Sequence, residues 1–132
     1  MPRGLNKVMI IGSLGRDPEM RFTAEGRPVA IFNVATVRQQ TGEGDQQIDW
    51  FHVVAWEDLA ERCKKYLHEN SQVYVEGRLQ TRSWEGPNGQ PHYRTELVAQ
   101  DIIFLEENGG TYASDNYPET LMNYEPDDSP VY

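Results

Sequence analysis

Two tryptophans on one predicted strand have the clearest capacity for chemistry. Residues 49–56 are β-branched and aromatic for the most part and contain no Gly or Pro, which favours a strand. Because side chains alternate along a strand, Trp50, His52, Val54 and Trp56 share one face. Six residues at about 3.3 Å each separate the indoles by roughly 20 Å, too far for mutual stacking. They can hold two separate flat ligands, or they can lie in a core or a subunit interface.

A second predicted strand, residues 72–84, mixes aromatic and cationic side chains on one face. That face consists of Tyr74, Glu76, Arg78, Gln80, Arg82 and Trp84. A dry core does not tolerate arginines without partners, so we interpret this face as a surface. Sequence-independent binding of single-stranded nucleic acid needs flat aromatics for the bases and cations for the backbone. The alternative is an oligomer interface, where Trp, Tyr and Arg are also enriched.

The acidic charge of the chain is concentrated near its C-terminal end. The formal net charge is −9 and the sequence pI about 4.7, which taken alone argues against a nucleic-acid-binding protein. All 12 basic residues, however, lie between Arg3 and Arg94, whereas residues 106–132 hold seven acidic residues and no Lys or Arg. The first 105 residues therefore carry −2, since 12 basic side chains face 14 acidic ones. Such a body can still present a basic face.

Residues suited to catalysis or metal binding are scattered along the chain. His52, His68 and His92 have no metal-ligand spacing with one another or with Cys63. In residues 12–15, Gly-Ser-Leu-Gly, the second glycine comes too early for a nucleophile elbow, and no phosphate-binding glycine loop is present. We therefore expect no enzymatic activity and no metal site.

The cysteine content and the N-terminal sequence predict a cytoplasmic protein. Cys63 is the only cysteine, so an intrachain disulfide is excluded and a reducing compartment fits. The N-terminus has no apolar signal core, and no apolar run is long enough to span a bilayer.

The hydrophobic pattern predicts an all-β fold with one helix. A helix is expected at 57–70, and Gly12 suggests a place where another backbone comes close. Main strands are predicted at 7–14, 29–38, 49–56, 72–84 and 92–99, with a possible short strand at 19–23 and a last apolar segment at 102–105. This is the order of a five-stranded OB-fold barrel; an open antiparallel sheet with the helix across one face is the alternative.

The composition divides the chain into two parts. Residues 106–132 contain tandem glycines, three prolines, seven acidic residues and only scattered apolar residues. Such a segment cannot bury enough apolar surface to fold alone. We therefore predict an OB-fold domain over residues 1–105, followed by a disordered acidic C-terminal tail over residues 106–132.

Five segments of this sequence, taken in order, resemble the bacterial single-stranded DNA-binding protein family. They are residues 3–8 (RGLNKV), 12–19 (GSLGRDPE), 50–54 (WFHVV), 71–79 (SQVYVEGRL) and 81–84 (TRSW). The resemblance covers roughly residues 3–105. It implies an OB fold and a homotetramer without a cofactor or catalytic activity. It also implies that single-stranded DNA wraps around the protein and is protected during replication, recombination and repair, in association with the nucleoid.

The resemblance places the stacking aromatics at three tryptophans. They are Trp50, Trp56 and Trp84, and the pattern of the second strand adds Tyr74. Trp56 stands where many relatives have Phe, which keeps the ring. A further stacking tryptophan of some relatives falls near Gln40, so we expect a weaker or shorter DNA path there.

Cations for the phosphate backbone are expected beside these aromatics. Each nucleotide adds a negative charge, and neutralising it supplies much of the affinity for a single strand. The candidates are Arg3, Lys7, Arg78 and Arg82.

The last residues of the chain resemble a docking tip only in part. The family usually has a long linker, an acidic run and a terminal Ile-Pro-Phe that binds replication and repair proteins. Here the linker is short, Ser replaces Ile, and Val precedes the final aromatic. The candidate tip residues are Asp127, Asp128, Pro130 and Tyr132. The alternative is a tail that only solvates the protein. In addition, the acidic tail is expected to compete with DNA for the basic face.

Two other functions remain open at this point. One is an OB-fold adaptor whose aromatic face binds protein, and the arginines among the aromatics argue against it. The other is a replication accessory like the primosomal protein, which the motifs around Trp50 and Trp84 fit less well.

Overall fold

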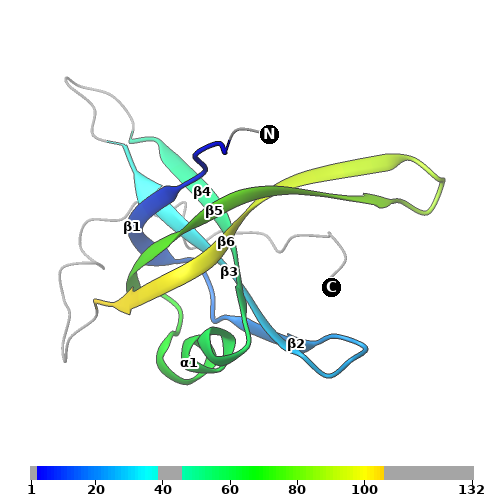
Figure 1. Ribbon diagram of the computed structural model, residues 1–132. Coiled ribbons are helices and arrows are strands. Elements are labelled where there is room, and N and C mark those ends of the chain that lie inside the picture. The colour runs from blue at the N-terminus through cyan, green and yellow to red at the C-terminus, as the bar shows by residue number, and fades with distance from the viewer. Residues whose placement is uncertain (1–2, 39–45, 106–132) are drawn as a thin grey trace.

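The computed structural model describes residues 3–38 and 46–105, which form six strands and one helix (Figure 1). The strands are β1 (Val8–Leu14), β2 (Glu19–Phe22), β3 (Pro28–Val37), β4 (Ile48–Trp56), β5 (Gln72–Glu85) and β6 (Pro91–Phe104), and α1 (Asp58–Tyr66) follows β4. The first five strands agree with their predicted bounds to within one residue at either end. The predicted segments 92–99 and 102–105 are parts of the single strand β6.

All six strands belong to one sheet in the order β1-β5-β6-β4-β3-β2. Neighbouring strands are antiparallel except β4 and β6, which run parallel where Val53 and Val54 meet Leu97 and Val98. β1 also pairs with β3, through Ser13 opposite Ala35. This mostly β arrangement with one helix is OB-fold-like, as predicted.

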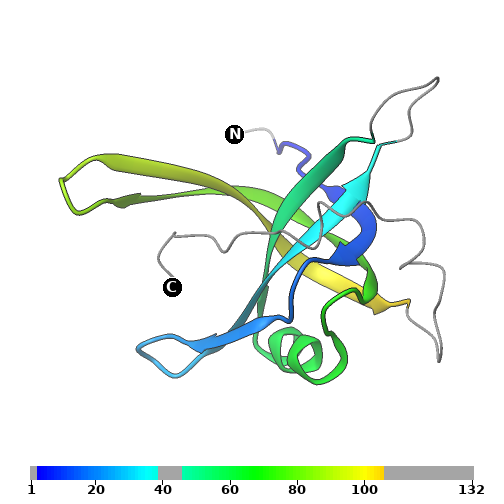
Figure 2. The ribbon, with the colours of Figure 1, turned by 180° about the vertical axis from the view of Figure 1, so that it is seen from behind.

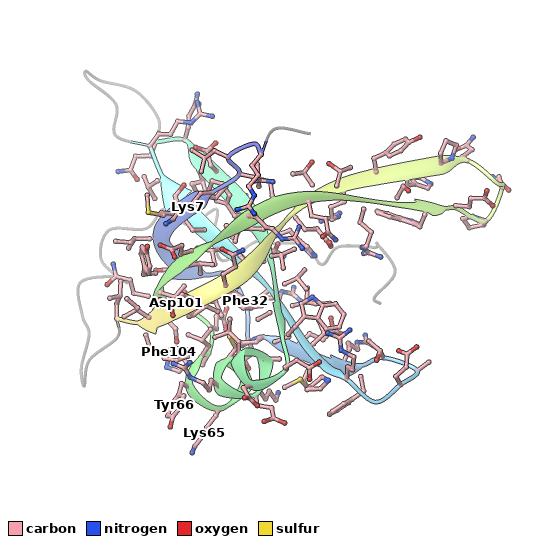
Figure 3. All side chains as sticks on the ribbon, viewed as in Figure 1. Lys7, Phe32, Lys65, Tyr66, Asp101 and Phe104 are labelled. Carbon is pink, nitrogen blue, oxygen red and sulfur yellow. The ribbon has the colours of Figure 1, made fainter. Side chains whose placement is uncertain are left out.

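Strand alternation places the core on one side of the long strands. Val53 and Ala55 of β4 are fully buried, and Val73 and Val75 of β5 are fully buried beside them. Phe32 of β3 lies in the middle of the molecule (Figure 3). The same face of β5 leaves the core at its far end, where Leu79 is 41% exposed.

Two glycines allow strands to cross at close range. A Cβ atom on Gly12 would lie 2.1 Å from the carbonyl oxygen of Ala35, and one on Gly77 would lie 2.0 Å from that of Val98. No real side chain fits at such distances, so the close backbone approach predicted at Gly12 is confirmed. At Gly77 the sheet also changes register, because a bulge falls between Glu76 and Gly77.

The helix is shorter than predicted and ends at Tyr66 instead of Asn70. Leu67 has extended backbone angles (φ −99°, ψ 145°) and turns its side chain into the core, which stops the helix. Tyr66 packs against Phe104 of β6 with ring centroids 5.4 Å apart, and Figure 3 shows the two rings side by side. Ala60 and Cys63 face the core from the helix.

Two hairpins project from the same side of the body, the long β5–β6 arm and the shorter β2–β3 hairpin (Figures 1 and 2). Each strand of the long arm has 14 residues. A turn at residues 86–89 closes it, with Gly86 N–H donating to the Gln90 carbonyl at 2.8 Å and Gly89 at a φ of 74°. The arm therefore carries the second predicted binding strand away from the core.

Candidate nucleic-acid interface

Alternate residues of β4, β5 and β6 form one continuous side of the sheet. Val54 of β4 is paired with Val98 of β6. Further along β6, Arg94 and His92 are paired with Arg82 and Trp84 of β5. Paired residues of neighbouring strands share a face, so the two predicted binding strands present their side chains to the same side. We call this side the tryptophan face and define it by Trp50, His52, Trp56, Arg82, Trp84, His92, Arg94 and Glu96.

The indoles of this face are partly accessible. Trp50 is 37% exposed, and Trp56 and Trp84 are half-buried. The three rings can therefore meet a ligand without any change in the sheet.

Trp56 lies under an arginine from the β2–β3 hairpin. The guanidinium carbon of Arg27 is 4.7 Å from the centre of the Trp56 ring. Glu57, which follows Trp56 in the chain, accepts a hydrogen bond from Arg27 Nε at 2.5 Å. A cation over an indole is attracted by the negative face of the ring.

Trp84 contacts two neighbours of the same arm. Arg82 places its guanidinium carbon 5.1 Å from the centre of the Trp84 ring. His92, the cross-strand partner of Trp84, stacks on it with centroids 5.7 Å apart and ring planes 18° apart. The imidazole shows that a flat ring already fits against this indole.

A buried carboxylate lies beneath the arm. Glu96 has no exposed surface, and its Oε2 is 3.4 Å from Arg82 Nε and 3.4 Å from His52 Nε2. On its other side, His52 Nδ1 is 3.1 Å from Asn33 Oδ1 and 3.4 Å from Arg94 Nη1. Burying a carboxylate is costly unless it is paired, and here Arg82 of β5 and His52 of β4 lie beside it.

An ion pair joins β3 to β4 next to Trp50. Arg38 donates from Nε and Nη2 to the two carboxylate oxygens of Asp49 at 2.9 and 2.8 Å. These hydrogen bonds hold the pKa of Asp49 below its usual value. The two-pronged contact fixes the strand ends from which Trp50 projects.

The structure does not bring Tyr74 together with Trp84. Tyr74 pairs with Ile11 and Ile103 at the β1 side of the sheet, and its hydroxyl donates to Glu76 at 2.9 Å. This hydrogen bond is the main reason why the pKa of Tyr74 is raised. Ten residue steps along β5 separate the two positions, roughly 33 Å at about 3.3 Å per residue, and strand twist turns them further apart, although both have even positions.

The predicted backbone cations occupy different places. Arg82 lies on the tryptophan face, whereas Lys7 is 3.5 Å from Glu76 at the β1 side. Arg78 is exposed and donates to Gln80 at 3.0 Å, and the β1–β5 register sets it beside Lys7. Arg3 is exposed before β1. Gln40, Asp127, Asp128, Pro130 and Tyr132 lie outside the described residues.

Comparison with known proteins identifies the family. The model of the single-strand binding protein family matches residues 5–105. The chain belongs to this family. It is 43% identical over 130 residues to the Single-stranded DNA-binding protein 1 of Chlorobaculum tepidum, covering 94% of this chain and 80% of that protein. Among solved structures it resembles the Plasmodium falciparum SSB complex with ssDNA, at a TM-score of 0.73 and 34% identity over 80% of this chain and 99% of the other.

Membership of the single-strand binding protein family establishes the class of function. These proteins bind single-stranded DNA and are not enzymes, and they are typically homotetramers that act with partner proteins in replication and repair. The expected resemblance, single-strand binding and lack of enzymatic activity are therefore confirmed.

The described residues offer neither a reactive thiol nor a metal site. Cys63 is buried, and burial raises the pKa of its thiol to about 12. Within residues 3–38 and 46–105, no cluster of His, Cys, Asp or Glu is arranged to hold a metal ion. The described helix is too short and too polar to cross a membrane.

Six residues beside the indoles or on the tryptophan face were not predicted as site residues. They are Arg27, His52, Glu57, His92, Arg94 and Glu96. The turn between β5 and β6 could have predicted two of them. Counting residue pairs outward from this turn sets Arg94 opposite Arg82, and Glu96 is the next residue of β6 on the same face. No comparable signal predicts Arg27, which meets Trp56 only through the pairing of β3 with β4.

Proposed function

We propose that the chain binds single-stranded DNA without sequence preference by stacking bases on Trp50, Trp56 and Trp84. The layering of arginine on the indoles of the tryptophan face carries this proposal, since it combines a flat apolar ring with positive charge. Every base has a flat face, so stacking tolerates any sequence. The chain functions in the cytoplasm, in association with the nucleoid.

Backbone contacts come from cations around this face. Arg82 lies next to Trp84, and the exposed Arg3, Lys7 and Arg78 extend the positive charge toward β1. Tyr74 is the weakest of the proposed stacking residues, because its neighbours are Ile11, Ile103 and Glu76 instead of the tryptophans. A base there would lie apart from the path over the tryptophan face.

Subunits meet at an apolar patch on the outer side of β1, β5 and β6. Met9, Ile11 and Ile103 are 62%, 55% and 49% exposed around Tyr74. Apolar side chains gathered in this way mark an interaction surface. A homotetramer covers them, which agrees with the assembly typical of the family.

The acidic tail, residues 106–132, follows the DNA-binding domain and has two roles. Its tip, with Asp127, Asp128, Pro130 and Tyr132, docks replication and repair proteins, and its seven acidic residues compete with DNA for the basic face. Removing residues 125–132 is expected to abolish partner capture. Truncation at Glu107 is expected to raise DNA affinity at low salt, and an unchanged affinity would rule out competition.

The decisive experiment is a titration with poly-dT followed by tryptophan fluorescence at two salt concentrations. Strong quenching is expected, because stacked bases quench the indoles. The logarithm of the binding constant should fall with that of the salt concentration, with a slope of about −0.7 for each phosphate neutralised. Binding without any quenching would overturn base stacking and assign the tryptophans to contacts with protein.

A further inference from the structure

Two tryptophans of the face share one arrangement of neighbours, in which a carboxylate holds an arginine and the arginine covers an indole. At Trp56, Glu57 accepts from Arg27 Nε at 2.5 Å, and Arg27 lies 4.7 Å from the ring centre. At Trp84 the corresponding distances are 3.4 Å from Glu96 to Arg82 and 5.1 Å from Arg82 to the ring.

The two arrangements are built from different local sequences. Arg82 and Trp84 are neighbours on one face of β5, and their carboxylate comes from β6. Arg27 and Trp56 are far apart in sequence and meet through the pairing of β3 with β4, and Glu57 follows Trp56 directly. No single sequence motif therefore accounts for the recurrence of the arrangement at both rings.

Electrostatics alone gives no reason for the carboxylates. DNA is a polyanion, and a negative charge beside its binding face lowers its affinity. An arginine without a fixed partner, however, samples many rotamers and loses that freedom when a ligand orders it. A carboxylate that fixes the guanidinium before DNA arrives offsets this loss.

We infer that Glu57 and Glu96 are positioning residues for single-strand binding. Each holds the arginine that covers one tryptophan, and so orients the indole on which a base stacks. This inference rests on the proposed function, because it assumes that bases stack on Trp56 and Trp84. According to this inference, the two carboxylates raise the affinity for DNA although their negative charge repels the DNA backbone.

The two carboxylates differ in burial, which predicts a different size of effect. The side chains of Glu57 and Arg27 are 51% and 55% exposed, whereas those of Glu96 and Arg82 are 0% and 16% exposed. Water screens the exposed pair, so its contribution is small. Glu96 is unscreened and also contacts His52, so its replacement is expected to disturb more of the face.

The first test compares Glu57→Gln with Glu19→Gln in poly-dT binding. Glu19 pairs with Arg21 on β2 at nearly the same exposure, 52% and 51%, but holds no arginine that the structure sets over an indole in its described part. Each variant removes one negative charge. We expect Glu57→Gln to bind about two- to fivefold more weakly, and Glu19→Gln to bind equally or more tightly.

A double-mutant cycle separates positioning from a merely structural role. If Glu57 acts through Arg27, Glu57→Gln has no further effect on affinity in an Arg27→Gln background. Time-resolved fluorescence anisotropy of Trp56, measured in a Trp50→Phe/Trp84→Phe background, should show a more mobile indole in Glu57→Gln. An equal loss of affinity in both backgrounds would overturn the inference for Glu57.

Glu96→Gln is the second test, with thermal unfolding as its control. We expect a loss of affinity of about tenfold or more in a variant that is still folded, since a buried partner of Arg82 is removed. If this variant does not fold, the cycle at Glu57 and Arg27 still decides the inference.

The inference and the proposed function fail in different ways. If wild-type fluorescence is unchanged when poly-dT binds, base stacking itself is wrong. If the wild type is quenched but Glu57→Gln and folded Glu96→Gln bind as tightly as Glu19→Gln, stacking stands and the positioning role is overturned.

Discussion

Arginines lie over two of the three indoles of the tryptophan face. Arg27 lies over Trp56, and Arg82 lies over Trp84. A guanidinium layered on a ring keeps N–H groups directed outward, where they can meet phosphate oxygens. One side chain can therefore support a stacked base and neutralise the backbone beside it.

Replacing individual tryptophans should separate ring stacking from general aromatic packing. We expect Trp56→Ala and Trp84→Ala each to weaken poly-dT binding by about 1–3 kcal/mol, the usual value of one stacked base. Phe at either position should retain most of the affinity, because it keeps a flat ring. Filter binding or fluorescence anisotropy of labelled DNA measures the effect without relying on the tryptophans. Tyr93→Ala is the control, since this exposed ring lies on the opposite side of β6, and an equal loss there would contradict the assignment.

The single thiol should be unreactive in the folded protein. Burial raises the pKa of Cys63 to about 12 from an ordinary value of 9.0, so hardly any thiolate forms near neutral pH. Iodoacetamide should therefore modify Cys63 only after unfolding in guanidinium, as read by mass spectrometry. The pKa of Cys63 is higher in the folded than in the unfolded protein. The protonated thiol therefore makes its full contribution to the free energy of unfolding below about pH 9. This contribution declines as the pH rises toward 12. Rapid alkylation of the native protein would show that the thiol is accessible.

Among the elements, the β5–β6 arm decides which side chains reach the face. Its register sets Arg82 opposite Arg94 and Trp84 opposite His92, beyond the region where the strands pack on the core. The close strand approach at Gly77 and the bulge before it lie where the arm leaves the body. The direction of the arm therefore depends on a residue without a side chain.

A side chain at Gly77 should damage the sheet. A Cβ atom would lie 2.0 Å from the Val98 oxygen and 2.8 Å from Leu97 Cδ2, so the backbone must move. We expect Gly77→Ala to lower the free energy of unfolding by about 1–3 kcal/mol, as overpacking does. Denaturation in guanidinium measures the change. Gly4→Ala, which has nothing within 4 Å of the new atom, should leave the stability unchanged. If both variants were equally stable, the close approach would not constrain the fold.

For the whole molecule, assembly and charge distribution matter more than net charge. The body carries −2 and still gathers cations around the tryptophan face, while Met9, Ile11 and Ile103 form an apolar patch around Tyr74. The patch and the tryptophan face occupy different parts of the outer surface of the sheet. One molecule can therefore bind other subunits and DNA at the same time.

A charge placed in the patch should dissociate the assembly. We expect Ile11→Glu to shift the protein from a tetramer to smaller species in sedimentation velocity, because the new carboxylate would be buried without a partner. Phe22→Glu is the control, since Phe22 is 64% exposed on β2, outside the patch. An unchanged mass for Ile11→Glu, or dissociation of both variants, would show that the patch is not the subunit contact.

Local sequence patterns were sufficient for the first five strands and for the faces of the three tryptophans, whereas β6 was predicted as two segments. Alternation between buried and exposed positions is a property of neighbouring residues, so the strand bounds and the faces of Trp50, Trp56 and Trp84 can be read without the fold. The close approach at Gly12 follows from the same reasoning, since a glycine inside an apolar strand commonly marks a bend or a backbone that passes close by.

Only the tertiary structure decided which of these residues meet. Tyr74 and Trp84 have the same parity on β5, yet Tyr74 is paired with Ile11 and Ile103 and Trp84 with His92, which alternation alone does not give. Arg27 covers Trp56 because β3 pairs with β4, and Glu96 meets Arg82 and His52 because β6 lies between β5 and β4. Such contacts depend on register between distant segments and on burial of charge, and these arise only when the whole sheet has formed.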